Sequence, residues 1–120
     1  MSVVTNVVIH YDTLEPNELP HAIASWFEER HSGISSITDG GARAFWGGEK
    51  NPECDLLAGA FNYLELDEML AYLAALPWEY PQSAQVWVKE QSDARFQLWL
   101  HDGTRFNRII DGLADLPEEP

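Results

Sequence analysis

Six stretches of the chain have the hydrophobic pattern of β-strands. β-Branched and aromatic residues dominate the first, and the last two alternate apolar with polar positions, as half-buried strands do. The fourth is largely apolar on both alternations, which predicts a central strand covered on both faces. The expected strands are residues 5–11, 34–38, 42–46, 56–63, 84–89 and 94–101.

Two further stretches have apolar residues at helical spacing. Each starts at a residue whose side-chain oxygen can accept a backbone N–H at a helix start, so Asn17 and Asp67 are expected to cap the two helices. Pro77 ends the second helix. The expected buried stripes are Leu19, Ile23, Trp26 and Phe27 in the first helix, and Met69, Leu70, Leu73 and Leu76 in the second.

The residues after Asp102-Gly103 leave two interpretations open. Asp-Gly is a turn signal, which could lead into one more strand over 104–110. The apolar positions after it also fit a helix, and we favour a short C-terminal helix. These positions are Phe106, Ile109, Ile110, Leu113 and Leu116.

The two halves of the chain show the same order of strand, helix, strand, turn and strand. Asn17-Glu18-Leu19 resembles Asp67-Glu68-Met69, fifty residues later. The order predicts an α+β fold of two β-α-β-β units, which form a pseudo-symmetric antiparallel or mixed sheet with both helices packed on one face. The expected boundaries are a single domain over 1–116, with half-units over about 3–48 and 54–101, and a frayed acidic tail over 117–120.

Length and composition agree with one globular domain. The chain has 120 residues, of which 45% are apolar. It contains no run of about 18 apolar residues and no signal segment at its start, so no membrane association is expected. Its single cysteine, Cys54, cannot form an internal disulfide. We therefore expect a soluble protein of the cytoplasm.

Charge is the strongest compositional feature. The formal net charge is −13, which repels phosphate backbones and argues against direct binding of nucleic acid. The distribution is uneven, with a net charge of −10 over residues 1–79 and +1 over residues 80–108. An acidic surface in the first two thirds would suit a basic protein partner, although the same charges could simply keep the protein in solution.

Signatures of enzyme chemistry are missing from the sequence. The glycine pairs at 40–41 and 47–48 lack the residues of a phosphate-binding loop. Cys54 lies between acidic residues, a setting unlike the electropositive surroundings of reactive cysteines. The four histidines have no metal-ligand spacing. We therefore expect no enzyme, no cofactor and no metal.

These observations favour a small non-enzymatic protein that inhibits a basic, nucleic-acid-handling partner. Immunity proteins against nuclease toxins, and phage inhibitors of restriction or CRISPR machinery, work in this way, with carboxylates that imitate phosphates. The expected contact residues are Glu49, Glu53, Asp55, Glu65, Asp67 and Glu68, with Trp46 as an aromatic anchor.

Two alternatives stay open. In the first, the protein is a structural or accessory homodimer that associates through aromatic side chains on an exposed sheet face, namely Trp87 and Trp99. In the second, it is a small ligand-binding or enzymatic domain with a pocket between the sheet and the helices.

Overall fold

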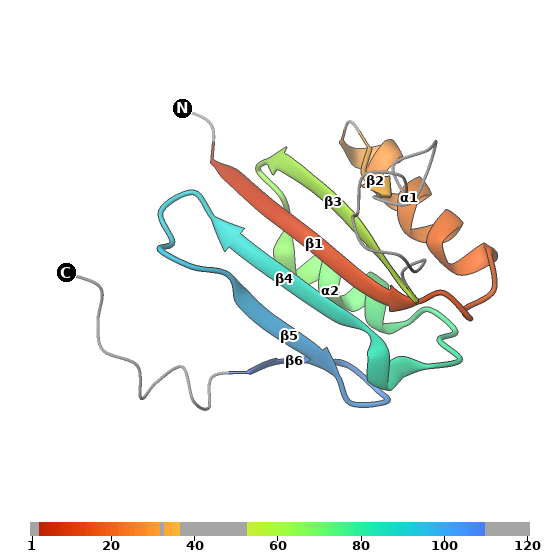
Figure 1. The fold of residues 1–120 in the computed structure, drawn as a ribbon. Coiled ribbons are helices and arrows are strands. Elements are labelled where there is room, and N and C mark those ends of the chain that lie inside the picture. Colours follow the sequence, from red (N-terminus) through yellow and green to blue (C-terminus); the bar gives the residue numbers. More distant parts are fainter. Residues whose placement is uncertain (1–2, 32, 37–52, 110–120) are drawn as a thin grey trace, which may run out of the picture.

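The computed structural model describes residues 3–31, 33–36 and 53–109. These residues form one six-stranded antiparallel sheet and two α-helices, which confirms the mixed α+β class (Figure 1). In chain order the elements are β1 (Val4–Asp12), α1 (Glu18–Arg30), β2 (Ser35–Ser36), β3 (Cys54–Asn62), α2 (Leu66–Ala74), the short 3₁₀ helix η2 (Pro81–Ser83), β4 (Gln85–Glu90), β5 (Gln97–His101) and β6 (Phe106–Ile109).

The strands lie in the order β2-β3-β1-β4-β5-β6, and all neighbours are antiparallel. Helix α1 leads from β1 to β2 past β3, and α2 leads from β3 to β4 past β1, so each helix connects two strands that are not neighbours. Residues 42–46, the expected counterpart of β5 in the first half, lie outside the described residues. The repeat of two β-α-β-β units therefore stays a prediction.

The core lies between the sheet and the two helices, which cover the same face of the sheet (Figure 1). Alternate residues of β1 are buried there, and Phe27 of α1 stacks on Phe61 of β3 with ring centroids 4.7 Å apart. Burial of each such large apolar side chain stabilises the fold by about 1.5–3 kcal/mol. The expected stripes are confirmed except at Leu76, which is half-buried and follows α2. Buried in the helices are Leu19, Ile23, Trp26, Phe27, Met69, Leu70 and Leu73.

The expected helix caps are wrong. Asn17 precedes α1, but its side chain makes no capping bond because the residue already has helical dihedral angles. Leu19 N donates to Pro16 O at 3.0 Å, so the chain starts to turn before Asn17. Asp67 lies inside the first turn of α2, where Glu65 occupies the N-cap position, again without a side-chain cap.

The favoured C-terminal helix is wrong over residues 106–109, which form β6, while 110–116 lie outside the described residues. The turn before β6 explains the difference. Gly103 has a φ of +100°, and the Asp102 carboxylate accepts the N–H groups of Thr104 and Arg105 at 2.8 and 2.9 Å. These bonds lower the pKa of Asp102 to about 2 and fold Phe106 back beside His101.

The prediction for β3 is wrong on one point. The strand is second from the edge of the sheet, and its residues on the face opposite the helices are half-buried or exposed, so it is not covered on both faces. Of the expected strand over 34–38, Ser35 and Ser36 form β2 and pair with β3, while residues 37 and 38 lie outside the described residues. The expected hairpin partner at 42–46 cannot be compared, because it lies outside the described residues.

Candidate protein-binding surfaces

Exposed carboxylates gather where α1 ends and α2 begins. We call this the acidic helix surface and define it as Glu28, Glu29, Arg30, Tyr63, Glu65, Asp67 and Glu68, all of which are exposed. The first three residues close α1, and the last four follow β3 and open α2. Carboxylates in the first turn of a helix also interact favourably with its dipole, so Asp67 and Glu68 fit this position without strain.

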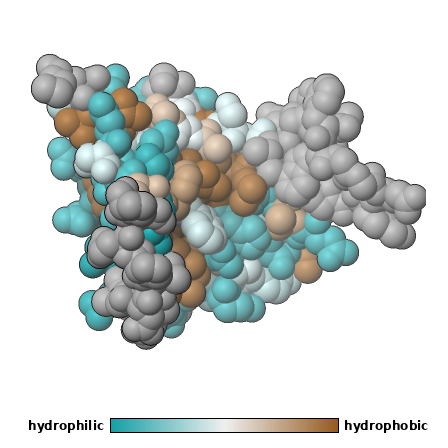
Figure 2. Space-filling view, turned by 60° about the vertical axis from the view of Figure 1, so that its left-hand side comes forward, coloured by the Kyte–Doolittle hydropathy of each residue, from teal (hydrophilic) through white to brown (hydrophobic). Residues whose placement is uncertain are grey.

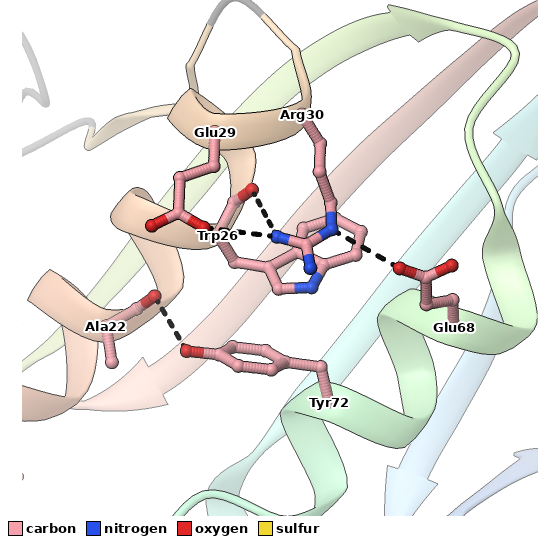
Figure 3. A network of polar contacts seen from close by, with 6 residues as sticks. All are labelled: Ala22, Trp26, Glu29, Arg30, Glu68 and Tyr72. Atoms are coloured by element: carbon pink, nitrogen blue, oxygen red, sulfur yellow. Dashed lines mark hydrogen bonds and ion pairs between the residues drawn. The ribbon is translucent and has the colours of Figure 1, made fainter.

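Arg30 joins the two helices across this surface. Its Nε donates to Glu68 Oε1 at 3.3 Å, and Nη1 lies 3.5 Å from Glu29 Oε2 (Figure 3). The guanidinium also lies 4.6 Å from the centre of the Trp26 ring. Because these ion pairs are largely exposed, each stabilises the fold by less than about 1 kcal/mol. These contacts matter more for recognition than for stability, because they show how carboxylates of this surface bind a guanidinium group.

Tyr72 supports the arrangement from α2. Its ring stacks on Trp26 with centroids 5.8 Å apart, and its hydroxyl donates to Ala22 O at 3.1 Å (Figure 3). The face of Trp26 is therefore held in place by both helices. Beside it lies a hollow of about 250 Å³, lined by Trp26, Arg30, His31, Tyr63, Glu65 and Glu68. Aromatic rings and carboxylates together suit the cationic side chains of a partner.

The second surface is the face of the sheet opposite the helices, which we call the open face. In the described part of the chain no helix covers it (Figure 1). A shallow hollow of about 380 Å³ lies on it, and apolar surface gathers in the middle of the view in Figure 2. The side chains lining the hollow are Val8, His10, Leu56, Gln85, Trp87 and Phe96. Trp87 and Phe96 are 36% and 39% exposed, which is high for large apolar groups.

Trp87 and Trp99 do not share this face, which corrects the expectation that both form one aromatic platform. Trp87 is paired with Leu98, whereas Trp99 is paired with the buried Val86 and packs against the core on the helix side. Directly paired residues of antiparallel strands point to the same face. Trp87 therefore lies among Phe96, Leu98 and other apolar groups, and Trp99 is unsuited to surface association.

The carboxylates expected at a partner contact do not form one cluster. Glu65, Asp67 and Glu68 lie on the acidic helix surface, but Glu53 precedes β3 at its other end. The nine residues of β3 span about 30 Å. Glu49 and Trp46 lie outside the described residues. Sequence reasoning missed Glu28 and Glu29, which the 3.6-residue period places on the outward side of α1.

Asp55 is not a surface carboxylate, so this expectation is wrong. The residue is 6% exposed, because the alternation of β3 turns it toward the helices. Its carboxylate accepts hydrogen bonds from the Tyr11 hydroxyl at 2.7 Å, from Ser36 Oγ at 2.8 and 3.0 Å, and from Leu56 N at 2.8 Å. Burial, together with Asp55, raises the pKa of the Tyr11 hydroxyl above its ordinary value. The network is a structural tie between β1, β2 and β3.

The described residues contain no group of three or more His, Cys, Asp or Glu side chains that could hold a metal ion. Among them, neither helix is long and apolar enough to cross a membrane. Comparison with protein-family models, with curated proteins and with solved structures gave no match to this chain.

Proposed function

We propose that the protein is a cytoplasmic, non-enzymatic binding protein that inhibits a basic, nucleic-acid-handling partner through its acidic helix surface. The observation that carries this proposal is the presence of five exposed carboxylates where α1 ends and α2 begins, of which Glu29 and Glu68 pair with Arg30 and Glu65 lines the hollow beside it. These carboxylates are Glu28, Glu29, Glu65, Asp67 and Glu68.

A surface of this kind acts through electrostatics. It attracts Lys- and Arg-lined clefts, accelerates association with them, and occupies the positions that phosphates would take. The contacts around Arg30 support the idea, because Glu29, Glu68 and the Trp26 ring already hold one guanidinium of the chain itself. Arginines of a partner would meet Glu29, Glu65 and Glu68 at the rim of this surface, next to the exposed Tyr63 ring.

Removal of negative charge from the acidic helix surface is expected to weaken partner capture by about tenfold. Removal of the same number of charges elsewhere on the protein should leave capture unchanged. The test variant is E65Q/D67N, whose carboxylates form no hydrogen bond or ion pair within the described part of the chain. The matched control is E18Q/E79Q, which removes two exposed charges beside the hollow near Pro16. Immobilised protein is exposed to nuclease-treated host lysate at 50 and 300 mM salt, and bound proteins are identified and quantified.

Support for the proposal is the capture of a basic nucleic-acid-binding protein that is lost in high salt and reduced in E65Q/D67N only. Capture that does not respond to salt, or that falls equally in both variants, contradicts it. In the second case the net charge of the chain, and not this surface, would govern binding.

A further inference from the structure

The open face is nearly free of charge although the chain carries a net charge of −13. Among its strand positions, as given by the pairing register in the described residues, only Asp12 and Lys89 have charged side chains. The exposed carboxylates of the acidic helix surface lie on the other side of the sheet. Of the surfaces described, the open face is therefore the one on which two copies of this acidic protein can approach without strong repulsion.

The two charges have opposite signs and lie at opposite ends of the open face. Lys89 is paired with Asn6 on β1, so it lies six residues, or about 20 Å, from the level of Asp12. Two copies can be stacked face to face by a two-fold axis that lies between the two sheets and runs perpendicular to the strands. The strands of the second copy then run in the opposite direction to those of the first. Each Asp12 then lies opposite the Lys89 end of the other copy, whereas an axis along the strands would bring like charges together.

The same rotation also brings apolar groups of the two copies together. The axis lies halfway between the levels of Lys89 and Asp12, which is between Val8, paired with Trp87, and His10, paired with Gln85. Trp87 of one copy is thereby carried over His10 and Gln85 of the other, which line the hollow of about 380 Å³. The charge pairing and the fit of Trp87 into the hollow thus require one and the same arrangement.

The face has the size of a small interface. At about 3.3 Å per residue β3 and β1 are each about 30 Å long, β4 is about 20 Å and β5 about 17 Å, which with strands about 4.8 Å apart gives on the order of 470 Å² per copy. Two copies would bury about 940 Å² in total, which is in the range of weak, transient interfaces. The acidic helix surfaces would point outward, separated by two stacked sheets about 10 Å apart and beyond the screening length of physiological salt.

We propose that the protein forms a two-fold homodimer in which the open faces pack together, with Trp87 in the hollow of the partner copy and Asp12 opposite Lys89. The dimer does not depend on the proposed inhibitory function, and it would display two acidic helix surfaces on opposite sides. Two such surfaces would give one dimer two contacts with a partner that has repeated basic sites.

The test is sedimentation velocity from 1 to 500 µM on the wild type and on K89D, D12K, D12K/K89D and W87Q. The wild type is expected to become dimeric over this range. K89D and D12K should each raise the dissociation constant by about tenfold or more, because each change occurs at two contacts of the dimer. D12K/K89D exchanges the charges and should restore most of the affinity, while W87Q should weaken the dimer in the same way as the single charge variants.

Matched controls separate this proposal from the inhibitory function. E18K changes a charge on the helix side and should leave the dimer unchanged, and so should E65Q/D67N. Circular dichroism and urea unfolding confirm that each variant is folded. A wild type that stays monomeric at 500 µM overturns the proposal, and so does a D12K/K89D variant that associates no better than K89D alone.

Discussion

Replacement of Asp55 with alanine is expected to lower the free energy of unfolding by about 3–5 kcal/mol. The change removes a buried carboxylate and leaves the Tyr11 hydroxyl, the Ser36 hydroxyl and the Leu56 N–H without this acceptor. Each buried donor that is left without an acceptor costs about 1–3 kcal/mol, because it stays desolvated. Urea unfolding followed by tryptophan fluorescence measures the loss.

Two variants separate the contributions within this network. D55N keeps one acceptor oxygen and should lose less than D55A. Tyr11→Phe removes a single donor and should cost about 1 kcal/mol at pH 7. A D55A variant as stable as the wild type would show that Asp55 does not tie the three strands together.

The alkaline side of the stability profile follows from the same contacts. Because the folded state raises the pKa of Tyr11, ionisation of its hydroxyl is easier in the unfolded chain. The stabilising contribution is complete below the ordinary tyrosine pKa of about 10 and is lost progressively as the pH rises above it. Y11F should therefore lose less stability than the wild type between pH 9 and 11.

Replacement of Glu15 with alanine is expected to cost about 2–4 kcal/mol. Glu15 lies between β1 and α1 and is only 5% exposed. Its Oε1 accepts from Glu79 N at 3.0 Å and its Oε2 from Tyr80 N at 2.7 Å, so it ties the start of α1 to the segment that follows α2. Hydrogen bonds to a charged acceptor are worth about 1.5–3 kcal/mol each, and part of this is regained from water.

Hydrogen exchange gives a local readout for this prediction. The amides of Glu79 and Tyr80 should lose protection in E15A well before the amides of β1 do. The exposed Glu18→Ala serves as the control and should change stability by less than about 0.5 kcal/mol. Equal effects of E15A and E18A on stability would contradict the role of Glu15.

The pattern of apolar residues predicted most of the elements, because each has a strong period of its own. In α1 the four apolar residues at helical spacing are the four that the fold buries, and in β1 a two-residue alternation separates core from open face. The prediction of a helix after Asp102 was wrong because apolar residues such as Phe106 and Ile109 fit both the helical and the strand period. There the turn made by Asp102 and Gly103 decided the outcome.

The open face could be anticipated only in part, because it depends on strand register. The sequence gives the alternation within 84–89 and within 94–101, but not which residue lies opposite which. Pairing of Val86 with Trp99 turns Trp99 toward the core, and a shift of one residue would have turned it outward. Val8 and Leu56 join Trp87 only because β1 lies between β3 and β4 in the sheet.

Charge counting could not separate carboxylates that face solvent from those that hold the fold together. Asp55 and Glu15 contribute to the net charge of −13, yet both are buried and satisfied by hydrogen bonds. Glu53 and Glu65 are exposed, but they lie at opposite ends of β3. Among the expected carboxylates that the structure describes, burial removes Asp55 and distance along β3 removes Glu53, which leaves Glu65, Asp67 and Glu68 together at the start of α2.

The central claim is that the acidic helix surface, and not net charge alone, receives a basic partner. Titration of an arginine-rich probe peptide into ¹⁵N-labelled protein, followed by amide chemical shifts, tests it most directly. We expect saturable shifts at Glu28–Arg30 and at residues 63–68 that salt suppresses, with little change at Glu18, Glu79 and Asp102. Shifts of similar size at every exposed carboxylate would contradict the claim.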